Sequence, residues 1–566
     1  MIIKGIGASK GVAIAKVFKI EEKELVITKE AKNVEAEIQA YQNAVQKVIA
    51  RIEKTKSLAD SEEHAAIFEA HIAMVQDPMM DEQIKNAITN DKVSAEFATK
   101  GAYETFIATF EAIDDPYFRE RTADLKDLLK KMLYAIKGMG EVDLTTISEE
   151  VIIVAEDLSP SQTVQLNKKY VQGFVTNIGG PTSHTAIMAR SLGIPSVVGT
   201  NNIMQHAHNG ELIALNGSTG EVVVKPTKEE IEQYEKAEKE YQEYLAKLNK
   251  LKGKKSETTD KHHVELAANI GTPKDLDSVL ENDGEAIGLF RSEFLYMDND
   301  NWPTEDEQFE AYKAVVKGMN GKRVVIRTLD IGGDKTLKYF KFPEEMNPFL
   351  GYRAVRFCLQ NEEIFLTQLR ALVRASEFGK VAIMFPMITN VPEFLQAKSL
   401  FDKAYEQVVA KHPNVAKKSD IEVGLMMETP SAGVLSDQFC KYADFVSIGT
   451  NDLIQYSMAA DRMNENISYL YQPLNPSILR LVKMVIDGAH KHGKWAGMCG
   501  EMAGDSRALP LLLGLGLDEF SMSASSILAS RELVNKLSYK EMQALAQEAL
   551  ELESEQQVID LLKNRL

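Results

Sequence analysis

The sequence predicts a multidomain α/β protein with four parts: an N-terminal α/β domain, a helical bundle inserted into it, a linker helix, and a C-terminal (β/α)8, or TIM, barrel. Three observations support this. The chain has 566 residues, more than one hydrophobic core usually organises. The spacing of apolar residues changes from strand-like to helical and back within the first 226 residues. After Lys261, eight short apolar runs alternate with intervals long enough for helices.

The first part begins with the turn glycines of GIGASKG, and VAIAKVFKI then alternates as a strand does. From Val34 to Ile136, apolar residues recur every three or four positions, which predicts a helical hairpin bundle. From Val151, short β runs separated by Gly, Pro and Asn return. We therefore expect the opening strands to share a core with this later region. The predicted boundaries are 1–22 plus 144–226 for the α/β domain and 23–143 for the bundle.

The next part is a heavily charged helix with a thin apolar stripe, and we place the linker at residues 227–260. A helix of this kind often bridges two domains. An ordinary surface helix of either neighbour fits the same pattern, so both interpretations stay open here.

The barrel is predicted over residues 261–566. Its expected strands are VELAANI, AIGLF, RVVIRT, VAIMFPMI, EVGLMME, FVSIG, KWAGMC and EFSMS. In a (β/α)8 barrel, reactive side chains follow the carboxyl ends of the strands. Polar residues occupy these positions after the second, third, fifth, sixth and seventh runs: Arg291, Arg327, Glu428, Asn451, Asp452 and Cys499. Structural charges would scatter, so this clustering indicates a site.

Composition narrows the functional classes. The formal net charge is −18, which argues against general binding to nucleic acid or to an anionic membrane. The three cysteines are widely spaced and give neither a disulfide framework nor a zinc motif. Neither a signal peptide nor a membrane-spanning segment is evident, so we expect a cytoplasmic protein.

The most specific motif is GGPTSHTAIMAR at residues 179–190. A tight turn leads to His184, and the following run predicts a short helix whose N-terminus would favour an anion on the ring. Imidazole is a competent phosphoryl acceptor near neutral pH, because one ring nitrogen is unprotonated. Taken alone, a turn histidine is as often a capping or core residue.

The full motif resembles the phosphohistidine signature of enzymes that use phosphoenolpyruvate, among them pyruvate phosphate dikinase, phosphoenolpyruvate synthase and Enzyme I of the bacterial sugar phosphotransferase system. Six barrel segments resemble the phosphoenolpyruvate site of the same family: GLFRSEFLYM, RTLDIGGDK, NPFLGYRAVR, METPSAG, SIGTNDLIQYSMAADR and GMCGEMAGD. The overall layout is similar to that of Enzyme I, the phosphoenolpyruvate-protein phosphotransferase.

This resemblance implies a role for each matching residue. His184 would carry the phosphoryl group as a phosphohistidine intermediate, and Cys499 would donate a proton. Substrate-binding positions would be Arg291, Arg327, Arg353, Asn451, Asp452 and Arg462. Glu428 and Asp452 would hold Mg²⁺.

Elementary chemistry agrees with these roles. Phosphoenolpyruvate carries a carboxylate and a phosphate, which planar arginine forks bind well. Two carboxylates on one rim suit Mg²⁺, although a solvated pair is the simpler interpretation without the resemblance. A thiol can protonate the enolate left after phosphoryl loss.

The implied activity transfers the phosphoryl group of phosphoenolpyruvate to His184 and then to a histidine of the phosphocarrier protein HPr, the first step of sugar uptake by the phosphotransferase system. The resemblance also implies HPr docking on the helical bundle and a homodimer formed through the C-terminal domain. Because His184 must face two partners in turn, we expect its swivelling domain to move about residues 221–261. The alternatives are an ATP-linked dikinase or synthase and a non-catalytic phosphoenolpyruvate sensor. The region before the β-rich segment has no Gly-rich phosphate loop, which disfavours the first.

Overall fold

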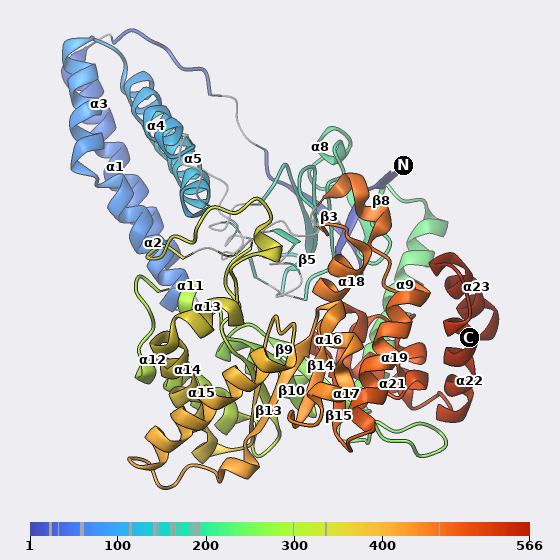
Figure 1. Ribbon diagram of the computed structural model, residues 1–566. Helices are drawn as coiled ribbons and strands as arrows, with labels where there is room; N and C mark the ends of the chain where they lie inside the picture. The colour runs from blue at the N-terminus through green and yellow to red at the C-terminus, as the bar shows by residue number, and fades with distance from the viewer. Residues whose placement is uncertain are drawn as a thin grey trace. The chain divides into compact units, whose positions relative to one another are not determined.

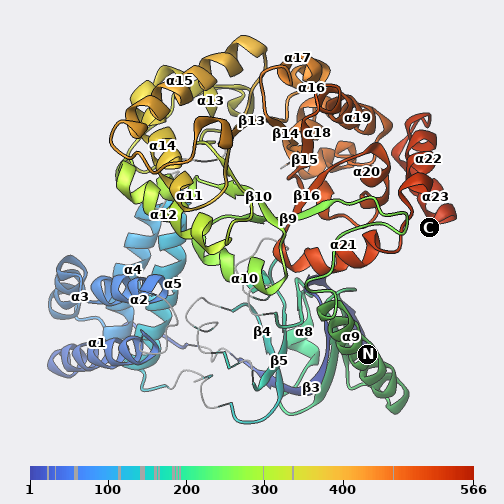
Figure 2. The same ribbon diagram turned by 90° about the horizontal axis from the view of Figure 1, so that it is seen from below.

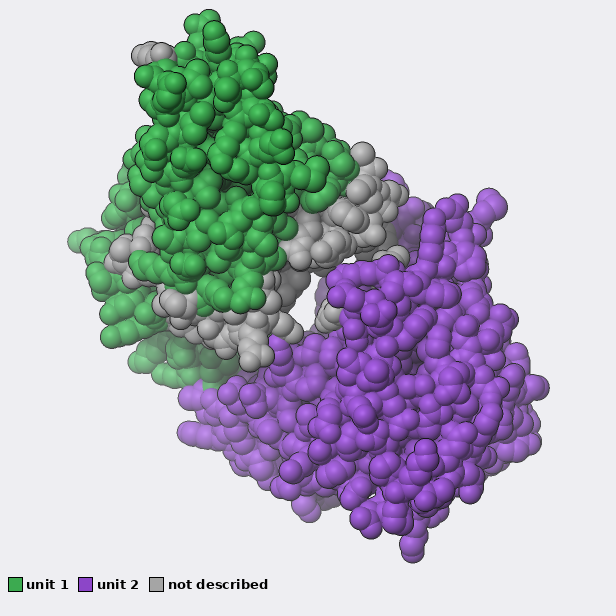
Figure 3. Space-filling view, turned by 90° about the vertical axis from the view of Figure 1, so that its left-hand side faces the viewer, with its two compact units in different colours: residues 1–245 green, residues 246–566 purple. Residues whose placement is uncertain are grey.

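The protein is described by a computed structural model in which the chain divides into two compact units, residues 1–245 and 246–566 (Figures 1 and 3). The structure describes residues 1–21, 25–31, 33–56, 62–111, 116–139, 144, 147–158, 162, 166–167, 169–180, 185–186, 189, 193–297, 299–333, 335, 337–462 and 464–566.

The α/β part of the first unit is an eight-stranded sheet in the order β1-β8-β7-β3-β4-β5-β6-β2. Its strands are β1 Ile2–Lys4, β2 Ile6–Ser9, β3 Val12–Lys19, β4 Val151–Ala155, β5 Val171–Thr176, β6 Ser196–Val198, β7 Leu212–Asn216 and β8 Glu221–Val224, with the short helix α8 Ile203–His206. Strand β3 pairs in parallel with β4, so the two ends of the inserted region meet in one sheet. This confirms the predicted α/β core with an insertion.

Every residue of strand β4 is apolar and buried. Ile152 and Val154 pack into one core cluster, whereas Val151 and Ile153 pack into another. Successive side chains of a strand point to opposite faces, so both faces of the sheet are covered at β4.

The insertion is the predicted helical bundle. Its helices are α1 Val34–Lys56, α2 Glu62–Val75, α3 Pro78–Asn90, α4 Ala95–Glu111 and α5 Pro116–Ile136. Ala44, Ile84, Ile88, Ala95 and Leu128 are completely buried in its core. They come from four of the five helices, as expected where each helix presents one apolar stripe.

The predicted linker helix is α9, Lys228–Asn249, and it crosses the division between the two units. Within the first unit, Tyr234 packs with Val12, Ala214 and Val223, and its hydroxyl donates a hydrogen bond to Glu221 Oε1 at 3.0 Å. The finer domain boundaries given above stay predictions.

The second unit contains a closed barrel of eight strands in the order β9 to β16, and every neighbouring pair is parallel. The strands are β9 Glu265–Ile270, β10 Ala286–Arg291, β11 Val324–Arg327, β12 Val381–Phe385, β13 Glu422–Met427, β14 Phe445–Ile448, β15 Trp495–Met498 and β16 Glu519–Met522. All eight coincide with the predicted runs, and Figure 2 shows them surrounded by helices.

The helices of the second unit are α10 Leu276–Glu281, α11 Phe294–Met297, α12 Glu305–Gly318, α13 Val355–Gln360, α14 Glu362–Ala375, α15 Val391–Val409, α16 Pro430–Val434, α17 Ser436–Phe439, α18 Thr450–Met458, α19 Pro476–His490, α20 Leu509–Leu515, α21 Ile527–Val534, α22 Tyr539–Leu550 and α23 Glu555–Arg565. Local sequence sets several starts. Asn475 caps α19, and Pro476 occupies its first turn, where no amide donor is needed. Among the described residues, no helix combines the length and apolar character needed to cross a bilayer.

The amino-terminal end of the barrel holds a charged cluster centred on Arg323. Its guanidinium contacts the carboxyl group of Glu265 and forms an ion pair with Glu519 at 2.7 Å. It also lies 3.9 Å from the ring centre of Trp495, a cation–π contact. Burial, followed by the Glu519 carboxylate, raises the pKa of Glu265 to about 8. Glu265 therefore keeps its proton at neutral pH, next to the charged guanidinium of Arg323.

Replacing Glu265 with glutamine is expected to flatten the pH dependence of barrel stability. The pKa of this carboxyl group rises from about 4.3 in the unfolded chain to about 8 in the folded protein. Its contribution to the free energy of unfolding is therefore fully present below about pH 4.3 and is lost as the pH rises to about 8. One such proton changes the free energy of unfolding by at most about 1.4 kcal/mol per pH unit. Both tryptophans, Trp302 and Trp495, lie in the barrel, so their fluorescence during denaturant unfolding reports on this unit. Glu310→Gln, on the outer helix α12, is the control and should keep the wild-type slope; equal slopes in all three proteins would contradict the prediction.

Candidate active site

The carboxyl ends of the barrel strands carry the residues predicted for the site. Arg291 and Arg327 are the last residues of β10 and β11, and they are register partners in these neighbouring strands. Glu428 follows β13 directly, and Cys499 follows β15. These predicted site residues therefore lie at the rim where reactive groups of such barrels gather, and their roles stay predictions.

The two neighbouring arginines differ in their surroundings. Arg291 is exposed, and its guanidinium forms no ion pair with any described residue. Arg327 is 7% exposed and pairs with Glu293 and, at 3.2 Å, with Asp330. The Nε of Arg327 is buried and has no hydrogen-bond partner within the described chain. A free cation beside a rigidly held one suits an anionic ligand.

Asp330 is the centre of a buried ion-pair network. Besides Arg327, it binds Arg353 Nη2 at 2.8 Å and Lys335 Nζ at 3.4 Å. Lys335 also reaches Glu293 Oε1 at 2.8 Å. Burial alone would raise the pKa of Asp330, but Lys335, Arg327 and Arg353 hold it well below its usual value. Asp330 is therefore a charged support that fixes two predicted substrate-binding arginines.

Arg353 is brought to the rim by a close backbone approach. Gly332 has a φ of +113°, and a Cβ at this position would lie 2.5 Å from the Cβ of Arg353. Ala354, which precedes α13, has a φ of +52°, an uncommon conformation for a residue with a side chain. The glycine pair of the RTLDIGGDK motif thus makes room for an arginine that comes from a different motif.

Asp452 joins the remaining predicted residues to this network. It lies in the first turn of α18, where its Oδ2 is 3.5 Å from Arg353 Nη2 and its Oδ1 is 3.8 Å from Arg462 Nη1. Asn451 lies beside it. The Oδ1 of Asn451 accepts a hydrogen bond from the Glu501 amide at 3.2 Å.

Glu428 is buried, and its Oε1 accepts a hydrogen bond of 2.6 Å from the Met387 amide. No ion pair forms at Glu428 within the described residues. Burial raises its pKa to about 8, with further contributions from Asp452 and Asp330 that outweigh the opposing arginines. A negative charge on Glu428 is therefore not neutralised by the arginines around it, and the carboxylate of Asp452 lies close by.

That donor set fits a divalent cation. Neighbouring carboxylates are the ligands that hard cations prefer, and a cation between Glu428 and Asp452 would relieve their repulsion. The described residues contain no group of three or more His, Cys, Asp and Glu side chains arranged to hold a metal ion. A cation held by these two residues would therefore complete its shell with substrate oxygens and water, as Mg²⁺ commonly does.

Cys499 lies in the barrel interior, where it packs with Leu289, Met384 and Met426. Burial raises the pKa of its thiol to about 11, so the thiol stays protonated at neutral pH. Its backbone amide donates to Ile448 O at 3.1 Å, which ties the end of β15 to β14. A Cβ at Gly500 would collide with Thr450 Oγ1, so the glycine lets the turn after Cys499 pass close to α18.

His184 lies outside the described residues, and so do Pro181, Thr182 and Ser183. The described flank on the carboxyl side is Thr185, whose hydroxyl donates to Asp157 Oδ1 at 2.8 Å. Thr185 is thereby tied to the segment that follows β4. The predicted helix after His184 falls largely outside the described residues as well.

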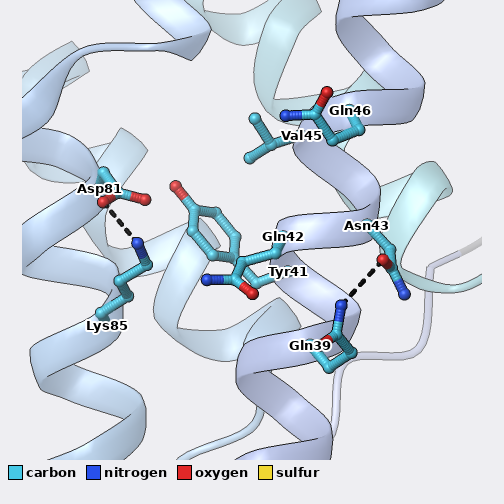
Figure 4. A pocket seen from close by; sticks show the side chains of 8 residues that line it. All are labelled: Gln39, Tyr41, Gln42, Asn43, Val45, Gln46, Asp81 and Lys85. Carbon is cyan, nitrogen blue, oxygen red and sulfur yellow. Dashed lines mark hydrogen bonds and ion pairs between the residues drawn. The ribbon is translucent and has the colours of Figure 1, made fainter.

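A depression of about 440 Å³ on the helical bundle contains none of the predicted site residues (Figure 4). Four of its polar side chains form two pairs, each within one helix. Gln39 donates to Asn43 at 3.0 Å, and Lys85 pairs with Asp81 at 2.8 Å. The catalytic groups predicted from the sequence therefore lie elsewhere.

Comparison with known proteins decides the family. Models of phosphoenolpyruvate-utilising enzymes match three stretches of the chain: the N-terminal model matches residues 4–121, the mobile-domain model 147–220 and the phosphoenolpyruvate-binding model 245–539. A phosphoenolpyruvate-protein phosphotransferase from Listeria innocua is 54% identical, over 99% of this chain and 98% of the relative. The relatives of the same name from Bacillus subtilis and Staphylococcus aureus (strain MRSA252) are 52% and 51% identical, over 99% and 100% of this chain and 99% of each relative.

The chain belongs to the phosphoenolpyruvate-protein phosphotransferase family. As a member, it is an enzyme, a phosphotransferase. This confirms the resemblance stated from the sequence.

The structure adds residues that sequence reasoning missed. Glu293, Asp330 and Lys335 were not singled out, although they hold Arg327 and Arg353 in place. All three lie inside the quoted motifs GLFRSEFLYM and RTLDIGGDK. The available signal was the unusual density of opposite charges next to apolar strand ends.

Proposed function

We propose that the chain transfers the phosphoryl group of phosphoenolpyruvate to His184 and then to a histidine of the carrier protein HPr, the first step of sugar uptake by the phosphotransferase system. The observation that carries this proposal is the ion-pair network at the barrel rim, which orders Arg327, Arg353 and Arg462 around Asp330 and Asp452. The family assignment favours this activity over an ATP-linked dikinase or synthase and over a non-catalytic sensor.

Substrate binding follows from this charge arrangement. The exposed guanidinium of Arg291, with Arg327 beside it, offers two forks to a phosphate. Arg353 and Arg462 flank Asp452 and would, with Asn451, orient the rest of the substrate. The carboxylates behind the arginines keep these forks fixed, so little reorganisation is needed when charge moves during transfer.

Glu428 and Asp452 would hold Mg²⁺. When bound, the cation would offset negative charge on the substrate oxygens. The chain's own contribution here is to keep two buried carboxylates close together, beyond the ends of the neighbouring strands β13 and β14.

The proposed transfer has two chemical steps. An imidazole nitrogen of His184 forms a bond to phosphorus while the bond from phosphorus to the enol oxygen breaks, and the electron pair stays on that oxygen. The Cys499 thiol then gives its proton to the methylene carbon, which converts the enolate to pyruvate. Solvent returns a proton to the thiolate.

Partners and setting follow from the resemblance. HPr would dock on the helical bundle, two chains would associate through the C-terminal domain, and the protein would act in the cytoplasm. None of these needs nucleic acid or membrane insertion.

Labelling with phosphoenolpyruvate tests the central claim. Purified protein with Mg²⁺ and phosphorus-labelled phosphoenolpyruvate should acquire acid-labile, base-stable label, because phosphoramidate bonds have that stability. His184→Ala should abolish the label and the later transfer to HPr. The control is His208→Ala, an exposed histidine of the same unit, which should label normally. Label that persists in His184→Ala would show that another residue is the acceptor.

A further inference from the structure

Arg531 is a completely buried arginine far along the chain from the residues assigned above. It lies on α21 and is 0% exposed. Its Nη2 donates to Asp283 O at 2.9 Å, and its Nη1 pairs with the Asp283 carboxylate. A buried guanidinium of this kind is tolerated only when most of its donors are satisfied.

The other donors of Arg531 reach the segment that follows α9. Its Nη1 donates to Leu251 O at 3.1 Å, and its Nε donates to Ser256 Oγ at 3.0 Å. Asp283 also accepts a hydrogen bond of 2.7 Å from the Gly253 amide. One buried side chain therefore binds the barrel loop before β10 and the end of the predicted linker at once.

Neighbouring contacts fix the same segment to the same helix. Lys247 pairs with Glu532 at 2.6 Å, one residue after Arg531. The Glu257 amide donates to Asn535 Oδ1 at 3.2 Å, and the Thr259 amide donates to Leu537 O at 2.9 Å. Residues 247–259 are thus attached at several points to α21 and to the turn that follows it.

The middle of α9 is held differently. Its ion pairs run along the helix, Lys236–Glu240 at 3.8 Å and Lys239–Glu243 at 3.9 Å. These side chains are more than 60% exposed, and such pairs contribute little to stability. The exposed face of the middle of α9 is therefore held only by weak pairs within the helix, whereas its end and the following segment bind the barrel through a buried arginine.

We propose that Arg531 is a positioning residue that fixes residues 251–259 to the barrel, so that the movement bringing His184 to and from the barrel takes place N-terminal to Lys247. This inference rests on the proposed function, because only a His184 with two partners needs such a movement. A fixed pivot keeps the returning imidazole aligned with phosphorus, and small misplacement of reacting groups is costly. Phosphorylation of His184 by phosphoenolpyruvate needs this alignment, whereas transfer from His184 to HPr does not.

Arg531→Lys tests the proposal in the full-length protein, since it keeps the charge and loses the planar fork. Amide hydrogen exchange of residues 250–259 should rise about tenfold. In single-turnover experiments, the rate of His184 phosphorylation should fall about tenfold, while the apparent affinity for phosphoenolpyruvate and the transfer from phosphorylated protein to HPr stay unchanged. The matched control is Arg480→Lys, another barrel arginine, which donates to Leu550 O through Nε and Nη2 at 2.9 and 2.6 Å. It should alter neither half-reaction.

Two results would overturn the proposal. One is normal hydrogen exchange of residues 250–259 in Arg531→Lys, which would show that the anchor is dispensable. The other is faster exchange with an unchanged rate of His184 phosphorylation. Ser256→Ala repeats the test from the linker side if Arg531→Lys folds poorly, since it removes only one partner. If wild-type protein acquires no label on His184, the proposed function fails, whereas the exchange experiment still decides whether Arg531 anchors the linker.

Discussion

Replacing Arg327 with methionine is expected to lower the free energy of unfolding of the barrel by about 3–5 kcal/mol, because it leaves two buried carboxylates with one partner fewer. Glu293 and Asp330 are 4% and 2% exposed, and both pair with Arg327. Phosphorylation of His184 should fall at least about a hundredfold, since a fixed donor to the moving phosphoryl group is lost. Tryptophan fluorescence in urea measures the first effect, and single-turnover labelling measures the second.

Two further variants separate stability from catalysis. Arg327→Lys keeps a charge near Glu293 and Asp330, so most of the stability should return while labelling stays slow without the planar fork. Arg370→Met removes an arginine that also makes two ion pairs at 2.8 Å, with Glu305 and Glu363, but on the outer helix α14. It should leave labelling unchanged. Normal labelling in Arg327→Met, or equal loss in Arg370→Met, would show that Arg327 only supports the fold.

The barrel could be predicted because its signal is local. Each strand is a short apolar run, and parallel strands place their carboxyl ends on one rim. Arg327, Glu428 and Cys499 follow directly from this rule, since each stands at or just after a strand end. Placing these residues at the rim requires no knowledge of which side chains contact one another.

The pairing of charges could not be predicted in this way. Asp330 lies three residues beyond a strand end, and its partner Arg353 is 23 residues further along the chain. No periodicity connects them, because the described residues between them form no helix or strand of the barrel until the short helix at Pro348–Leu350. The chain is turned there by Gly332 and Ala354, which adopt conformations that spacing does not reveal.

Some assignments stay predictions for a different reason. The motif around His184 identifies the residue, but the residue's surroundings fall outside the described part of the chain. Its proposed role depends on two partners that would bind it in turn, and neither partner leaves a periodic pattern in this sequence. Arg531 illustrates the converse. A lone arginine in an ordinary helix carries no sequence signal, yet Arg531 is buried and donates hydrogen bonds to Leu251 and Ser256.

Replacing Cys499 with alanine is expected to slow steady-state transfer from phosphoenolpyruvate to HPr by about a hundredfold to ten-thousandfold, the range usual for loss of a general acid. The apparent affinity for phosphoenolpyruvate should stay the same, because the thiol acts after the phosphoryl group has moved. Without a proton donor, the enolate oxygen attacks the phosphorus of phospho-His184 and re-forms phosphoenolpyruvate more often than the enolate is protonated to pyruvate. The measurement is pyruvate formation alongside phospho-His184 in a quenched time course. Unaltered pyruvate formation in Cys499→Ala would assign the proton to another group.

Cys440→Ala is the matched control, since Cys440 is also buried in the second unit but lies after α17, away from the carboxyl ends of the strands.

Burial raises the pKa of Cys499 to about 11, so only about one thiol in a thousand is ionised at pH 8. Wild-type activity should therefore show no loss of its proton donor between about pH 6 and about pH 9, and alkylation of Cys499 should be slow over the same range. A weaker acid gives up its proton less readily to most acceptors, but an enolate carbon is a strongly basic acceptor once the enol oxygen is no longer bonded to phosphorus. The Cys499 thiol is protonated throughout the neutral pH range and can therefore supply this proton. Its burial among the apolar side chains of the barrel interior keeps it protonated.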